Sequence, residues 1–126
     1  MNNFERDTRS PLAVEVTSRG DGTLGVTVAG EVDMATAPLL QGTVIDAIDR
    51  HAPAHVVLDA AGMHFLDAAG VTALITIYRH AAAQDAAVRL INVRPLVGTV
   101  LHLVDLADFL RAEPRAAGAI PEPGHH

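Results

Sequence analysis

Alternating apolar and polar residues begin at residue 12 and predict two strands. The segments LAVEVTS and TLGVTV each place three apolar residues on one face of an extended chain: Leu12, Val14 and Val16 in the first, and Leu24, Val26 and Val28 in the second. Between them, RGDG has the glycines typical of a hairpin turn. An antiparallel hairpin is therefore expected, followed by a loop over GEVDMATAP.

A helical spacing of apolar residues follows that loop. The first helix is expected to begin at a cap formed by Asp33 or Thr36, with Pro38 in its first turn. Its buried positions recur at i, i+4, i+7 and i+8: Leu40, Val44, Ala47 and Ile48.

Two more helices are indicated by the same spacing. The second is expected from Asp67 to about Gln84, on the apolar positions Val71, Leu74, Ile75 and Tyr78. The third follows Pro95 and buries Val97, Val100, Leu101 and Val104. The remaining apolar residues are expected to complete the core: Leu106, Phe109 and Leu110.

Two further strands lie between these helices. The unbroken apolar run Val56 to Leu58 predicts a strand that is central in the sheet and buried on both faces, and VRLINV at 88–93 predicts another. The intervening segments are long enough for crossover helices that join parallel strands. The order ββαβαβα therefore predicts an α/β fold with a mixed β-sheet of four to five strands and helices packed on it.

A length of 126 residues fits one domain with a single core. The polar residues 1–11 are expected to form a flexible N-terminal arm and residues 12–112 the domain. Residues 113–126 are rich in proline and glycine, which predicts a flexible C-terminal tail.

The charge balance narrows the class of partner. A net charge of −6 and an isoelectric point near 5.5 disfavour nucleic acid, whose phosphates require clustered cations. No apolar stretch approaches the roughly 20 residues that cross a bilayer, so no membrane insertion is expected. Because no charged and then apolar leader opens the chain, the cytoplasm is the default location.

Several kinds of chemistry are excluded by the residues that the sequence lacks. It contains no lysine, which rules out a Schiff base or a phosphate-loop lysine, and its two serines are Ser10 and Ser18, near the N-terminus. Its seven histidines do not form a pair at i, i+4 on one helix beside a carboxylate, and there is no cysteine. Neither a metal site nor a cofactor is expected.

Three aspartates lie at or near the carboxyl ends of predicted strands: Asp33, Asp59 and Asp67. If they converged they could form a phospho-acceptor site or a glycosidase pair. A receiver-type phospho-acceptor would need a lysine, and a glycosidase would need a substrate cleft that a small domain with 3% aromatic residues is poorly equipped to form. Capping of turns and helix N-termini is the favoured role, and no enzymatic activity is expected.

Three segments carry a family resemblance: TVAGEVDMATAPLL, HVVLDAAGMHFLDAAGVTALI and LINVRPLVGTVLHLVDLADFL. In this order and at these separations they resemble the STAS domain family, specifically the bacterial anti-sigma factor antagonists, over about residues 12–111. Residues 30–33 match a GELD-like segment of the family. Residues 57–71 match its VLDLSGVxFIDSSGL-like segment.

The resemblance implies protein–protein switching. Such an antagonist binds an anti-sigma factor, usually a serine kinase of the histidine-kinase ATPase fold, and thereby frees the sigma factor. Phosphorylation of the first serine after the aspartate ends the binding, and the corresponding residue here is Ala68. The second serine of the family corresponds to Ala69, so we expect a member that is not regulated by phosphorylation at the usual place.

The implied binding surface combines the Asp33 loop with the start of the second helix: Asp33, Met34, Thr36, Asp67, Ala68, Ala69, Gly70 and Thr72. Asp67 is expected to cap the helix, Gly70 to let a partner's backbone approach, and the alanines to form a flat apolar contact. Thr72 is either a substitute phosphate acceptor or a hydroxyl that is buried or bonded to the backbone.

Two other classes stay open at this point. The chain could be a constitutive scaffold or subunit of a stress-signalling assembly or a lipid transporter, as other STAS-like proteins are, and it could form a homodimer. Self-assembly that is insensitive to salt would favour the scaffold. A hydrolase or phosphotransferase that uses the three aspartates ranks last.

Overall fold

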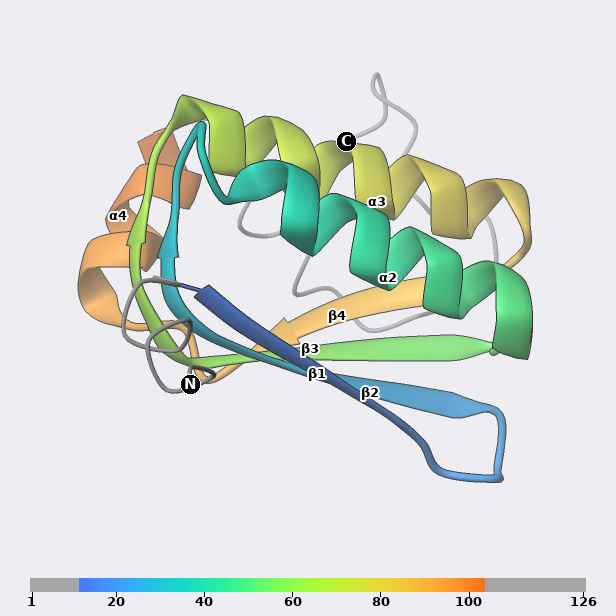
Figure 1. Cartoon of the computed structure of the whole chain (residues 1–126). Coiled ribbons are helices and arrows are strands. Elements are labelled where there is room, and N and C mark those ends of the chain that lie inside the picture. The colour runs from blue at the N-terminus through green and yellow to red at the C-terminus, as the bar shows by residue number, and fades with distance from the viewer. Residues whose placement is uncertain (1–11, 104–126) are drawn as a thin grey trace, which may run out of the picture.

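The computed structural model of the chain describes residues 12–103, which form one sheet with helices packed on it (Figure 1). Its elements follow in the order β1 (Leu12–Ser18), β2 (Thr23–Val32), α2 (Ala37–His51), β3 (His55–Leu66), α3 (Ala68–Ala83), β4 (Ala87–Ile91) and α4 (Pro95–Leu103). This order confirms the ββαβαβα pattern.

The sheet is mixed and has four strands in the order β1-β2-β3-β4. Strands β1 and β2 pair antiparallel as a hairpin, and β3 pairs parallel with both β2 and β4. Helices α2 and α3 are the crossovers that parallel neighbours require. The predicted α/β fold with a mixed sheet and a central third strand is therefore confirmed.

The helices divide between the two sides of the sheet. Helices α2 and α3 lie next to each other on one face, while α4 packs on β3 from the opposite side (Figure 1). The core lies mainly between the sheet and the helix pair. The positions expected to be buried on the first helix all face it: Leu40, Val44, Ala47 and Ile48.

Helix α3 is rotated slightly from the predicted orientation. Val71 and Leu74 are buried as expected, but Ile77 is buried in place of Ile75 and Tyr78, which are half-buried. Ala73 and Ala81 are also buried, and their small side chains leave room for this rotation.

Strand β2 is longer than the sequence pattern indicates. Residues 30–32, which were expected in a loop, remain in β2, because Gly30 pairs with Leu12 on one side and Met63 on the other. Only from Asp33 onward does the chain turn toward α2. The loop prediction was therefore wrong for these three residues.

Strand β3 carries two extra residues relative to β2. Between Thr27 and Ala29 of β2 and again between Gly30 and Glu31, the pairing skips one residue of β3. Such bulges bend a strand, and the ends of β2 and β3 curve together toward the side of α2 and α3 (Figure 1). Val57, expected to be buried on the second face, is only half-buried.

Some expectations lie outside the described residues. Val104, Leu106, Phe109 and Leu110 are among them, and the limits of the domain at residues 11 and 112 stay predictions. Within residues 12–103, the helices are too short or too polar to cross a bilayer.

Candidate functional site

The turn that follows β2 is fixed by its own polar groups. The Asp33 carboxylate accepts hydrogen bonds from the N–H groups of Ala35 at 2.9 Å and Thr36 at 3.1 Å. The Thr36 hydroxyl donates to the Glu31 carbonyl at 2.7 Å and accepts the N–H of Asp33 at 2.9 Å. Thr36 is only 6% exposed, so these bonds are shielded from water.

The two residues predicted to cap the first helix, Asp33 and Thr36, have different roles. Thr36 occupies the N-cap position of α2, but its side chain makes no capping bond because the hydroxyl turns back toward β2. The Asp33 side chain holds the turn just before the helix, and Pro38 lies in the first turn as expected. Met34, at the tip of this turn, is 79% exposed.

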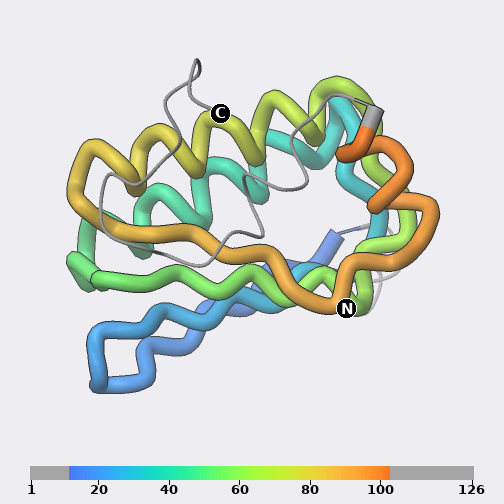
Figure 2. Tube along the Cα trace, turned by 180° about the vertical axis from the view of Figure 1, so that it is seen from behind, coloured from blue at the N-terminus to red at the C-terminus, as the bar shows by residue number. Residues whose placement is uncertain are grey.

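The junction between β3 and α3 is capped by Asp67, as predicted. Its carboxylate accepts the N–H groups of Ala69 at 2.9 Å and Gly70 at 3.1 Å, two of the groups that a helix N-terminus leaves without a partner. The Asp67 N–H itself donates to the Val32 carbonyl at 3.2 Å. This bond ties the end of β3 to the end of β2, and the two turns lie side by side (Figure 2).

Gly70 has a different role from the one expected. It is buried, and the backbone that approaches it belongs to Val32 of the same chain and not to a partner. A β-carbon at position 70 would lie 2.9 Å from the Val32 carbonyl oxygen and 2.5 Å from Leu66 Cδ1. Glycine at this position therefore lets α3 pack closely on β2.

We use the name junction surface for five residues of the turn after β2 and of the first part of α3: Met34, Ala35, Ala68, Ala69 and Thr72. Ala69 is half-buried and the other four are exposed. The Thr72 hydroxyl donates to the Ala68 carbonyl at 3.0 Å, which confirms a hydroxyl bonded to the backbone, although the residue is exposed. Thr36 and Gly70 lie beneath this surface and shape it, and Asp33 and Asp67 are half-buried.

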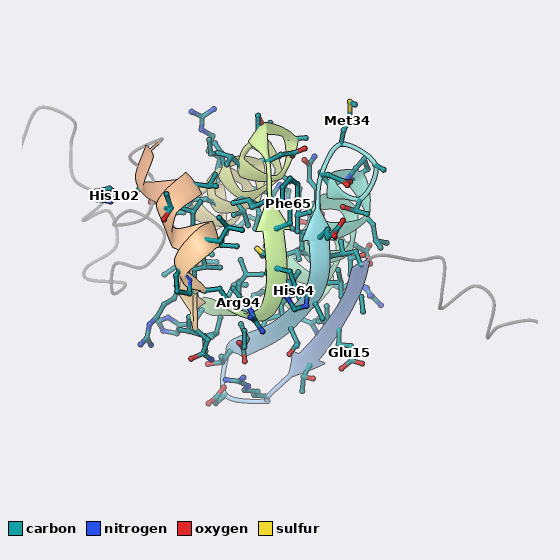
Figure 3. The ribbon with its side chains drawn as sticks, turned by 90° about the vertical axis from the view of Figure 1, so that its left-hand side faces the viewer. Glu15, Met34, His64, Phe65, Arg94 and His102 are labelled. Carbon is teal, nitrogen blue, oxygen red and sulfur yellow. The ribbon has the colours of Figure 1, made fainter. Side chains whose placement is uncertain are left out.

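Two further large apolar side chains, Leu39 and Phe65, are exposed on the described part of the chain. Phe65 is 41% exposed and Leu39 is 48% exposed. Met34 and Phe65 lie at the same end of the sheet (Figure 3). A bulge places consecutive residues His64 and Phe65 both at the surface, and strict alternation along a strand would not reveal this.

The three aspartates do not converge. Asp59 lies within β3 and not at its end, paired with Thr27 and Ile91, because β3 continues to Leu66. Its carboxylate accepts the Ala61 N–H at 3.0 Å and the Asn92 amide at 3.1 Å, and these bonds lower the pKa of Asp59. A catalytic or phospho-acceptor site built from all three carboxylates is therefore not supported.

One histidine, His80, takes part in a contact between two helices. His80 Nε2 lies 2.7 Å from the Asp49 carboxylate, which also accepts the Gln84 amide at 2.8 Å, so the network joins α3 to α2. Within residues 12–103, no three histidine or acidic side chains are grouped closely enough to hold a metal ion.

Comparison with known proteins identifies the family. The STAS domain family model matches residues 15–119, so the chain belongs to the STAS domain family. An anti-sigma factor antagonist from Mycobacterium paratuberculosis is 26% identical with a TM-score of 0.66, over 86% of this chain and 90% of that one.

Two structures of another antagonist share the fold. SpoIIAA in its unphosphorylated form is 20% identical with a TM-score of 0.69, over 86% of this chain and 93% of that one. The Bacillus cell fate determinant SpoIIAA in the phosphorylated form is 19% identical with a TM-score of 0.63, over 86% of this chain and 96% of that one.

Substituting Gly70 with alanine tests the contact between α3 and β2. The Gly70→Ala variant is expected to lose about 1–3 kcal/mol of unfolding free energy, because the Val32 carbonyl cannot move away from the new methyl group. Gly42→Ala is the matched control, since Gly42 is also helical but has open space around it. The control should gain up to about 1 kcal/mol from helix propensity. Urea unfolding measures both, and equal shifts would contradict the packing described.

The buried Thr36 hydroxyl can be tested in the same way. Thr36→Val keeps the shape but leaves the Glu31 carbonyl and the Asp33 N–H without a partner, so a loss of about 1–3 kcal/mol is expected. Thr43→Val, on the half-buried face of α2, provides a comparison in which a loss below about 0.5 kcal/mol is expected. If Thr36→Val were as stable as the unaltered protein, this hydroxyl would not hold the turn.

Proposed function

We propose that this chain is a non-enzymatic interaction domain that antagonises an anti-sigma factor by binding it through the junction surface. The observation that carries the proposal is that Met34 and Ala68 are both exposed and follow two strand ends that the Asp67 N–H to Val32 carbonyl bond holds together. Membership of the STAS family and the likeness to anti-sigma factor antagonists support this class of partner.

The composition of the junction surface suits binding to a protein. It offers small methyl groups and one long thioether side chain, without a charged group whose desolvation would oppose binding. The Asp33 and Asp67 carboxylates are already occupied by backbone N–H groups. A rigid apolar surface loses little conformational entropy when a partner docks, which favours affinity.

Position 68 lacks a group that could accept phosphate. In the family the serine at this place carries the switch, whereas Ala68 and Ala69 present only methyl groups. A phosphate here would add about −1.5 to −2 charges at the N-terminus of α3, next to the proposed contact. We infer that binding is not ended by phosphorylation at this position, and that the partner is an anti-sigma factor of the serine-kinase type.

A charge placed on the junction surface tests the site of binding. Ala68→Asp is expected to weaken the affinity for the anti-sigma factor at least about tenfold, because docking would bury an uncompensated carboxylate. The fold should persist, since an acidic residue at a helix N-terminus stabilises the helix by about 0.3–1 kcal/mol. Calorimetric titration with each serine-kinase anti-sigma factor of the source genome provides the measurement.

The matched control is Ala83→Asp, which adds the same charge at an exposed position at the other end of α3. Its affinity should stay within about twofold of the unaltered chain, as expected for a surface change away from the contact. Equal affinities of the two variants would place the contact elsewhere. If no anti-sigma factor binds the unaltered chain while the chain self-assembles in high salt, a scaffold role would replace the proposal.

Restoring the hydroxyl tests the missing switch. Ala68→Ser, incubated with the kinase partner and ATP, is expected to take up one phosphate at position 68 and to lose binding, whereas the unaltered chain keeps binding. Phosphopeptide mapping identifies the modified residue. Incorporation at Thr72 of the unaltered chain, with loss of binding, would show that a kinase can end the binding and would contradict a docking surface without a phosphorylation switch.

A further inference from the structure

We propose that Met34 is an oxidation-sensitive site, and that its conversion to methionine sulfoxide weakens partner binding. This inference rests on the proposed function for its effect on binding, but not for the selectivity of the oxidation. The reactant would be a two-electron oxidant such as hydrogen peroxide or hypochlorite.

Met34 is held at the surface by its neighbours. The residues on both sides of it are fixed, because the Asp33 carboxylate accepts the N–H groups of Ala35 and Thr36 and the Thr36 hydroxyl accepts the N–H of Asp33. The side chain is 79% exposed and extends away from the domain (Figure 3). It cannot fold into the core without breaking this turn, so its thioether stays accessible to a dissolved oxidant.

The other sulfur in the described residues is protected. Met63 is 0% exposed in the core, on the central strand β3. The sequence contains no cysteine and no tryptophan, and its third methionine, Met1, lies outside the described residues. Oxidation is therefore not diverted to a thiol or an indole of the same chain, and among residues 12–103 it falls on Met34.

Hydrogen peroxide supplies the oxygen atom and accepts the two electrons in this oxidation. The Met34 sulfur attacks one oxygen of hydrogen peroxide, an S–O bond forms as the O–O bond breaks, and water leaves. The sulfur loses two electrons and the peroxide gains them. A dithiol, acting through a methionine sulfoxide reductase, reverses the step by yielding the thioether, water and a disulfide.

Oxidation changes the part of the junction surface that reaches furthest from the domain. A thioether is apolar and adaptable in an interface, whereas a sulfoxide is polar and has a strongly accepting oxygen. Burying that oxygen without a hydrogen-bond donor opposes docking, and a loss of affinity of about 5- to 100-fold is expected. The junction surface would then respond to oxidants, although position 68 cannot respond to a kinase.

Peroxide titration of the full chain tests both parts of the inference. Peptide mapping by mass spectrometry is expected to show Met34 oxidised at least about tenfold faster than Met63, because Met63 reacts only when the core opens. Calorimetry with the anti-sigma factor should show weaker binding in proportion to Met34 oxidation. Reductase and dithiothreitol should restore it.

Two variants separate Met34 from other sites. Met34→Leu retains Met1 and Met63, and its affinity, whatever its untreated value, should not change with peroxide. Met34→Gln places a polar group at the same position and should bind weakly before any treatment.

The outcomes distinguish this inference from the proposed function. Comparable oxidation of Met34 and Met63, or full oxidation of Met34 with unchanged affinity, would overturn the inference and leave the proposed function standing. If the untreated chain binds no anti-sigma factor, the proposed function fails together with the effect of oxidation on binding. Peptide mapping still decides whether the oxidation is selective.

Discussion

The hydrogen bond from the Asp67 N–H to the Val32 carbonyl and the packing of Gly70 on Val32 hold two strand ends together. The turn that carries Met34 leaves β2 directly after Val32, and α3 begins directly after Asp67. The relative position of Met34 and Ala68 is therefore set by contacts below the surface. Side chains that a partner would touch contribute little to this frame, so contact and frame can be altered separately.

Aspartates at the ends of parallel strands often mark a catalytic edge of an α/β sheet, but here they serve the backbone. Asp33 and Asp67 each accept two N–H groups, and Asp59 holds a bulge of β3 and the Asn92 amide. What remains exposed at the junction is the Met34 thioether, small methyl groups and the backbone-bonded Thr72 hydroxyl. In the proposed function this surface binds another protein, and the regulation proposed for it uses the exposed Met34 thioether.

Much of this organisation could be predicted from the sequence, because it depends on local patterns. The order of elements, the mixed sheet and the Asp67 cap follow from periodicity and capping chemistry. The extension of β2 through residues 30–32 was missed because it depends on pairing with two distant strands. The exposure of Phe65 results from a bulge, and the burial of Gly70 results from the close approach of Val32. Neither the bulge nor the close approach can be recognised from the residues next to it in the sequence.

We propose that the chain works through a rigid surface where β2 and β3 end, without a reactive group on α3. Backbone amide chemical shifts, followed by NMR while the anti-sigma factor is added, test it most directly. The largest changes are expected at residues 33–36 and 68–72, with the rest of residues 12–103 little affected. Changes centred on the open groove between β1 and α2, lined by Val14, Val16 and Leu39, would contradict it.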